Sequence, residues 1–179
     1  MHTGSGETIK LEIAYLYDAS YKERCNARGE NFWFEYLKEI FCQLGISAKA
    51  VTPEASGIEE KLRELKVLFM GTQHVLDYGI EGAAKDIENW VAEGGLLIGF
   101  GVKGLDELFG IEPFSHIAQS PNDYTLSGYF EFTPHPLTQD IHSSLSPKQK
   151  LLIFSDIQQV KPKGGIELAH LYDREEKDA

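Results

Sequence analysis

The sequence is poor in cysteine, in basic residues and in long apolar stretches, and each shortage excludes a class of protein. Two cysteines among 179 residues do not make a disulfide framework. No apolar run approaches the roughly 20 residues of a membrane-spanning helix, so we expect no membrane partner. The 17 Lys and Arg against 28 Asp and Glu give a net charge of −11. A chain this acidic repels phosphate backbones, so we expect no nucleic-acid partner.

The composition that is present is that of a globular protein. At 42% hydrophobic and 25% charged residues, the chain is neither a disordered protein nor a coiled coil. Residues 1–8 have no apolar core and no basic region, so they are predicted to be a flexible leader and not a signal peptide. This favours the cytoplasm by default. We expect a single domain over residues 9–175.

The last residues suggest a chain that continues further. Residues 166–172 alternate as a strand does, and residues 173–178 are typical of a turn. A hairpin needs a second strand, and a folded protein usually covers or pairs an open edge. We therefore expect this chain to be a piece of a longer protein, which would be its partner. The alternative is a disordered polar tail after a complete domain, and an open edge would also allow a homo-oligomer.

Short apolar segments alternate with amphipathic ones in the first hundred residues. We predict strands at residues 11–17, 48–51, 66–70 and 96–100, and helices at residues 30–44, 57–65 and 82–93. Residues 66–70 are predicted to form a central strand, residues 96–100 a further buried strand, and residues 18–29 a polar loop. Continuous apolar strands between amphipathic helices indicate a parallel sheet covered on both faces.

The pattern changes after Gly104. A short helical turn is predicted at residues 105–108. Strands are predicted at residues 124–133, 151–154, 160–162 and 166–172. The predicted fold class is therefore α/β: a three-layer, flavodoxin-like, doubly wound and mainly parallel sheet with a β-rich C-terminal part.

Open parallel sheets bind ligands at the carboxyl ends of their strands. The polar or small residues that follow the predicted strands are the candidates for a ligand-binding cleft: Asp18, Tyr21, Asn26, Gln73, His74, Gly101 and Lys103. Asp18 and His74 would end neighbouring strands if the first strand lies beside the third. The two could then form an acid–base pair.

Several common sites are missing from these loops. Residues 18–28 contain no glycine, and Asp18 and Glu23 would repel a phosphate, which disfavours a flavodoxin-type flavin module. The pattern G-x-G-x-x-G occurs at residues 99–104, but it follows the fourth predicted strand and not the first, so it is weak evidence for a dinucleotide site. The histidines are too widely spaced to predict a metal site. We expect no metal and no cofactor.

One segment resembles a known family. Residues 93–101, EGGLLIGFG, are similar to the helix–GG–strand–elbow segment of the class I glutamine amidotransferase-like superfamily. Over residues 9–175 the chain is most similar to the branch of ThuA-like proteins and the β-galactosidase trimerisation domain. The further segments that carry this resemblance are KVLFMGTQ, ENWVAEGGLLIGF, ELFGIE and TPHPLTQDI.

The resemblance implies a domain without the family's nucleophile. Catalytic members have the elbow G-x-C-x-G, and the alignment puts Gly101 at the cysteine and Lys103 at the last glycine. The implied function is a non-catalytic accessory domain with a structural, oligomerisation or small-ligand role, the ligand being a carbohydrate in one version, linked to a carbohydrate-active enzyme. No catalytic residue is then expected.

Two alternatives stay open. The chain could be a ThuA-like hydrolase that uses Asp18 and His74, or a flavodoxin-type binding module. His135 is predicted to lie in a turn and not to be catalytic, and Cys25 is predicted to be a plain loop thiol.

Overall fold

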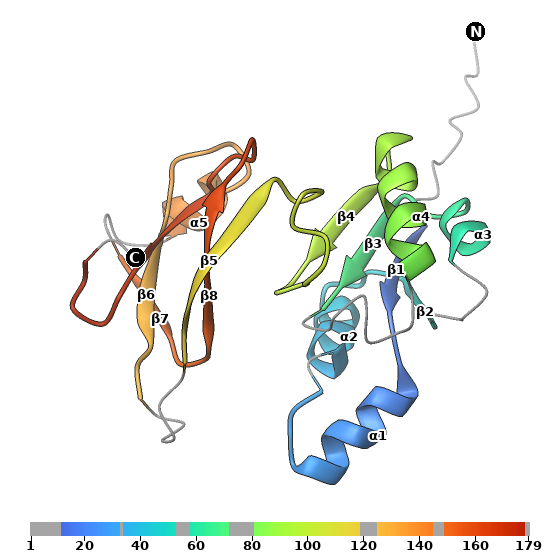
Figure 1. Cartoon of the computed structure of the whole chain (residues 1–179), viewed down its shortest axis with the longest axis horizontal. Helices are drawn as coiled ribbons and strands as arrows, with labels where there is room; N and C mark the ends of the chain where they lie inside the picture. Colours follow the sequence, from blue (N-terminus) through green and yellow to red (C-terminus); the bar gives the residue numbers. More distant parts are fainter. Residues whose placement is uncertain are drawn as a thin grey trace, which may run out of the picture. The chain divides into compact units, whose positions relative to one another are not determined.

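The computed structural model of the chain describes residues 12–32, 34–52, 58–71, 81–118, 125–144 and 149–177. The chain divides into two compact units, residues 1–105 and 106–179 (Figure 1). That residues 9–175 form one domain stays a prediction.

The first unit is mixed α/β and contains a four-stranded parallel sheet. Its strands, in the spatial order β2-β1-β3-β4, are β1 (Ile13–Leu16), β2 (Ala48–Val51), β3 (Val67–Met70) and β4 (Leu96–Gly99). Its helices are α1 (Ala19–Arg28), α2 (Phe34–Gln43), α3 (Glu59–Leu62) and α4 (Glu81–Ala92). The prediction of a central third strand is confirmed, because β3 lies between β1 and β4.

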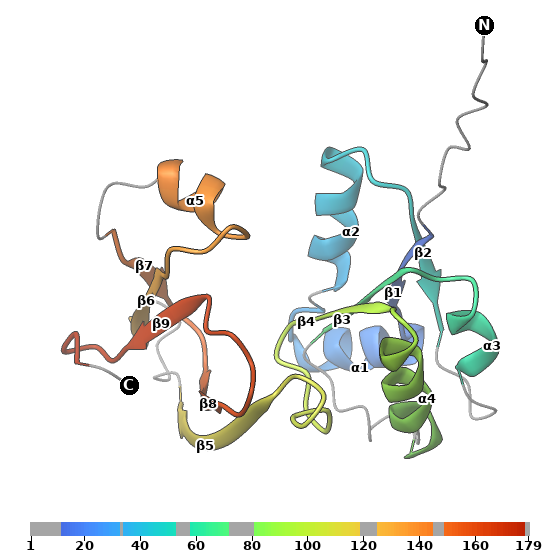
Figure 2. The same cartoon turned by 90° about the horizontal axis from the view of Figure 1, so that it is seen from above.

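Helices flank this sheet, with α2 on one side and α3 and α4 on the other (Figure 2). On the α2 side, Tyr15 packs with Phe32, Phe34, Phe41 and Cys25 in one buried cluster. Successive side chains of a strand point to opposite faces. The residues on either side of Tyr15 and of its β3 partner Phe69 therefore point to the opposite face. These residues are at most 2% exposed: Ala14, Leu16, Leu68 and Met70.

The prediction that the fourth strand is buried is wrong. Leu96 is 54% exposed and Phe100, directly after β4, is 50% exposed. The physical reason is position, because β4 is an edge strand of the sheet formed by the described residues. An apolar sequence shows that a strand can be buried, but it does not say whether an element covers it.

The prediction of a polar loop at residues 18–29 is also wrong, because most of it is the helix α1. Its two ends are capped. The Asp18 carboxylate accepts hydrogen bonds from the amides of Ser20 (2.9 Å) and Tyr21 (3.2 Å), and Gly29 ends the helix at φ 69°. Only Cys25 of this helix is buried, so the apolar periodicity that marks a helix is missing. The next helix, α2, begins at Phe34 and not at residue 30.

Two glycines fix the turn between α4 and β4. Gly94 has φ 101°, a conformation that residues with a side chain rarely adopt. A Cβ on Gly95 would overlap the ring of Trp90, whose Nε1 donates a hydrogen bond to the Leu65 carbonyl at 3.3 Å. The glycine pair therefore allows the buried indole to lie under the start of β4.

The second unit contains two antiparallel sheets. Strand β5 (Ile111–Ile117) pairs with β8 (Ile157–Pro162), and the central β6 (Gly128–Phe132) pairs with β7 (Leu151–Ile153) and β9 (Ala169–Tyr172). A short helix, α5 (Gln139–Ser144), follows β6.

Two of these elements were not predicted, namely β5 and α5. Strand β5 contains Pro113 and is mostly exposed, so it has neither the composition nor the alternation of a strand, and a register shift between Pro113 and Ser115 accommodates the proline. Helix α5 has only six residues.

The turn predicted at His135 is confirmed. Thr138, which is 3% exposed, donates a hydrogen bond from its hydroxyl to the Thr133 carbonyl at 2.6 Å. The same oxygen accepts one from the His135 amide at 3.1 Å, and His135 Nδ1 accepts one from the Leu137 amide at 3.2 Å. The ring of His135 therefore belongs to the turn.

The turn predicted after the last strand is also present in the described residues 173–177. The Asp173 amide donates to the Lys177 carbonyl at 2.9 Å, and the Asp173 carboxylate accepts from the amides of Glu175 and Lys177 at 2.8 and 2.9 Å. Across the described parts of both units, no helix is long and apolar enough to cross a bilayer.

We predict that Gly95→Ala lowers the free energy of unfolding by about 1–3 kcal/mol, as overpacking a buried site does. Urea unfolding followed by circular dichroism measures the loss. The matched control is the same change in a Trp90→Leu background, where the smaller side chain leaves room for the methyl group. If Gly95→Ala costs as much in that background as in the wild type, the ring contact is not the reason for the glycine.

Candidate functional site

The carboxyl ends of β1, β3 and β4 form one edge of the parallel sheet, and ligands of open α/β sheets bind at that edge. β1 ends at Leu16 and leads into Tyr17 and Asp18. The strand ladder continues one residue beyond β4, because the Phe100 amide donates to the Met70 carbonyl at 2.9 Å. Gly71, Phe100 and Gly101 therefore follow β3 and β4 at the same edge.

Asp18 lies at this edge as predicted, but its carboxylate has a structural task. One oxygen accepts from the Ser20 hydroxyl at 2.7 Å as well as from the two amides of the helix start. The other oxygen lies 3.7 Å from the guanidinium of Arg24. Through these contacts the Asp18 carboxylate caps the start of α1.

Tyr21 faces the core more than the solvent. Its ring lies 6.0 Å from that of Phe32, and the Arg24 guanidinium lies 5.4 Å from its centre. Burial first, and then a hydrogen bond with the Cys25 thiol, raise the pKa of the phenol. The hydroxyl therefore keeps its proton at neutral pH.

The remaining candidates for the ligand-binding cleft do not all lie at the carboxyl edge. Asn26 is exposed and lies eight residues after Asp18, about 12 Å further along α1. It does not join the strand ends. Lys103 is exposed shortly after β4. Gln73 and His74 lie outside the described residues, so the pairing of Asp18 with His74 stays a prediction.

Gly101 follows β4 with φ 60°, in the left-handed region that favours glycine. The chain thus turns sharply where it leaves the sheet, and the residue at the turn has no side chain to act as a nucleophile.

A polar cluster that the sequence did not reveal lies beside β1. The Glu35 carboxylate accepts a hydrogen bond from the Lys22 ammonium at 2.6 Å, and the same oxygen accepts one from the Tyr17 hydroxyl at 3.1 Å. Lys38 lies 3.9 Å from the other oxygen. The cluster joins β1, α1 and α2. Residues 22 and 35 are 13 positions apart on two helices, so no periodicity within one element could have indicated the contact.

Both ends of this ion pair are firmly charged. The hydrogen bond from Lys22, followed by the one from Tyr17, outweighs burial and lowers the pKa of Glu35, and the bond to Glu35 raises the pKa of Lys22. A general acid or base works best with a pKa near the operating pH. These shifts move both groups away from neutrality, so the pair suits binding and positioning better than proton transfer.

The thiols do not add a nucleophile to this edge. Cys25, predicted to be a loop thiol, is instead a helix residue that is 1% exposed and belongs to the aromatic cluster. Cys42 is exposed on α2. Nowhere in the described ranges do three or more His, Cys, Asp or Glu side chains gather as a metal site would require.

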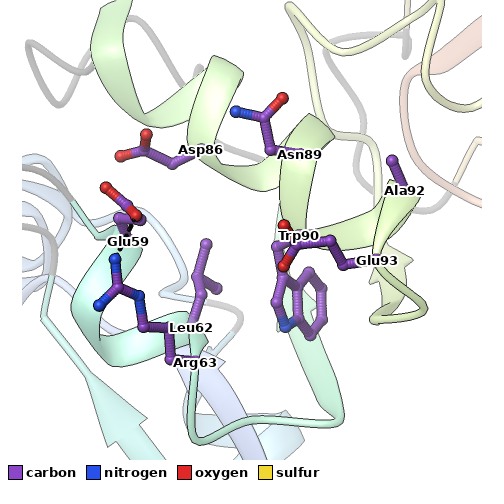
Figure 3. A pocket seen from close by; sticks show the side chains of 8 residues that line it. All are labelled: Glu59, Leu62, Arg63, Asp86, Asn89, Trp90, Ala92 and Glu93. Atoms are coloured by element: carbon purple, nitrogen blue, oxygen red, sulfur yellow. Dashed lines mark hydrogen bonds and ion pairs between the residues drawn. The ribbon is translucent and has the colours of Figure 1, made fainter.

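A groove of about 460 Å³ lies between α3 and α4 (Figure 3). Trp90 and Leu62 form its apolar part, and Asp86, Glu93 and the ion pair between Glu59 and Arg63 (2.6 Å) form its polar part. Helix α4 leads into the start of β4 and α3 into the start of β3. The groove therefore runs along one face of the unit and is separate from the carboxyl edge.

The N-cap role of Asp18 makes a testable distinction. We predict that Asp18→Ala lowers the free energy of unfolding by about 1 kcal/mol, as the loss of a cap does, whereas Asp18→Asn, which keeps an accepting oxygen, stays close to the wild type. Chemical denaturation measures both. Glu23→Ala, an exposed position on the same helix, is the control. An Asn variant as unstable as the Ala variant would contradict the role.

The lowered pKa of Glu35 predicts a pH dependence. The folded pKa lies below the unfolded value of about 4.3, so the ion pair stabilises the fold above that value and the benefit is lost as the pH falls through the folded pKa. The stability difference between the wild type and Glu35→Gln should therefore be present at neutral pH and shrink in acid. Denaturation at a series of pH values measures it, with Glu23→Gln as the control. A difference that is independent of pH would show that the ion pair is not its source.

No protein-family model matches the chain, and neither a curated protein nor a solved structure matches it. The residues at the carboxyl edge therefore carry the functional argument.

Proposed function

We propose that residues 9–175 form a non-catalytic domain of the class I glutamine amidotransferase-like type, in the branch of ThuA-like proteins and the β-galactosidase trimerisation domain. Its role would be that of an accessory domain of a carbohydrate-active enzyme, and its carboxyl edge would bind a small polar ligand.

The observation that carries this proposal is the turn at Gly101. A nucleophile elbow is a sharp and strained turn at the end of a strand. Gly101 has φ 60° directly after β4 and its neighbour Phe100, which fits an elbow in its backbone but supplies no reactive side chain. The Asp18 carboxylate supports the same interpretation, since its hydrogen bonds at this edge cap helix α1.

The arrangement of the strands supports the fold part of the proposal. The order β2-β1-β3-β4 corresponds to the first four strands of the flavodoxin-like order 2-1-3-4-5. Helices on both sides of that sheet agree with a three-layer, doubly wound domain, and strands β5 to β9 agree with a β-rich C-terminal part.

The polar cluster suggests the class of ligand. The charged pair of Lys22 and Glu35, with the Tyr17 hydroxyl beside it, offers hydrogen-bond donors and acceptors close together at the carboxyl edge. Carbohydrate hydroxyls both donate and accept hydrogen bonds, so a saccharide suits this set. The pKa shifts keep both charges in place over the neutral range.

A titration followed by ¹⁵N–¹H correlation spectra tests the binding part, with a panel of monosaccharides and disaccharides as probes. We expect shifts confined to the amides around Tyr17, Lys22, Glu35 and Gly101, and a loss of these shifts in Lys22→Ala. Lys66→Ala, which changes an exposed lysine at the amino end of β3, is the matched control and should leave them intact. If no probe in the panel shifts these amides, the binding part is wrong.

Activity assays test the non-catalytic part. Glutamine, p-nitrophenyl acetate and p-nitrophenyl glycosides should not be turned over above the buffer rate. Turnover that disappears in both Asp18→Asn and His74→Ala would overturn the proposal and establish the hydrolase alternative.

A further inference from the structure

Helix α2 has more apolar surface than its own sheet covers. Phe34 and Phe41 are buried, and Leu37 packs against the same cluster. Ile40 and Leu44, four positions apart and so on one side of the helical path, are 50% and 67% exposed. At 100° per residue, these two side chains lie on a flank next to the buried stripe.

Strand β4 exposes a matching surface on the same side of the sheet. In the register Val67↔Leu96 and Phe69↔Ile98, these β4 residues share a face with Phe69. Phe69 is covered by Phe41, with ring centres 4.8 Å apart, and stacks on Phe100 at 6.5 Å. Leu96 and Phe100 nevertheless keep about half of their surface in solvent. The cover that α2 gives to this face therefore ends at β3.

The two surfaces face the same space. Helix α2 runs opposite to the strands, since Phe34 at its start lies against Gly71 after β3, and its end leads through Ile46 into β2. Connections between parallel strands are right-handed. If the connection from β1 through α2 to β2 is right-handed, the flank of α2 that carries Ile40 and Leu44 points toward β3 and β4 and not toward β2. Ile40, Leu44, Leu96 and Phe100 thus form one surface, here called the β4-side patch.

We propose that the β4-side patch is a self-association surface, on which α2 of a second copy lies against β4. Parallel sheets are normally covered by helices on both faces, so the patch suits a helix with an apolar flank. Helix α2 is such a helix. In a twofold arrangement, α2 of each copy contacts β4 of the other copy. The same patch is then used by both copies, as an isologous dimer requires.

The area agrees with a dimer. Four half-exposed large side chains of about 200 Å² each offer about 400 Å² of apolar surface per copy. A standard interface buries about 800 Å² per partner, of which about 500 Å² is apolar in homodimers. The patch supplies most of that amount, and the polar residues Glu39 and Gln43, joined by a 3.0 Å hydrogen bond, lie next to it on α2. We infer a reversible dimer, and this inference does not depend on the proposed ligand or family.

Sedimentation equilibrium over a range of protein concentrations tests the proposal. The wild-type chain should show a monomer–dimer equilibrium, and Ile40→Lys and, separately, Leu96→Lys should shift it at least tenfold toward the monomer. Leu152→Lys, a half-exposed leucine in β7 outside the patch, is the matched control and should leave the equilibrium unchanged. Thermal unfolding of each variant confirms that it is folded.

Disulfide cross-linking gives a second test that does not need a charged substitution. A mixture of Ile40→Cys and Leu96→Cys, each in a Cys42→Ser background, should form covalent dimers on mild oxidation, because the proposed dimer places α2 of one copy against β4 of the other. The wild-type chain carries the exposed Cys42 about 200° further round the same helix, so it is the internal control and should form no covalent dimer. A wild-type protein that is monomeric at all concentrations, a dimer unaffected by Ile40→Lys and Leu96→Lys, or cross-linking through Cys42 to the same extent would each overturn the proposal.

Discussion

The packing of Phe41 between Tyr15 and Phe69 is the contact on which the first unit depends. Its ring centre lies 5.9 Å from that of Tyr15 and 4.8 Å from that of Phe69, so one side chain joins α2 to the two central strands. With α2 held there, Glu35, six residues earlier on the same helix, is in reach of Lys22 and Tyr17. The apolar packing therefore sets the position of the charged pair, and the charged pair in turn ties α1 to the sheet.

The sheet of the first unit could be predicted because its strands are short, apolar and separated by amphipathic helices. Residues 48–51 were predicted to the residue, and β3 and β4 to within one residue at an end. The helix α1 could not be predicted from periodicity, since only Cys25 is buried in it, although its two cap residues, Asp18 and Gly29, are readable signals. β5 was missed because Pro113 argues against a strand, and tertiary pairing with β8 overrides that argument.

The candidate site was predictable in place but not in detail. The rule that ligands bind at the carboxyl ends of parallel strands led to Asp18 and Gly101, and both lie there. It did not reveal that the Asp18 carboxylate would cap a helix, because the helix itself was not expected. Nor did it reveal Lys22 and Glu35, whose contact depends on how the chain turns between α1 and α2.

The burial of Cys25 has a practical consequence. Its thiol is 1% exposed between α1 and the aromatic cluster, whereas Cys42 of the same chain is open to solvent. A thiol reagent added to the native protein will modify Cys42 at once and Cys25 only when α1 detaches from the cluster. The ratio of the Cys25 labelling rate to that of Cys42 therefore measures how often α1 opens locally beside the carboxyl edge. A bound ligand that joins α1 to α2 would lower the labelling rate of Cys25. That effect would be visible even if the global stability of the protein did not change.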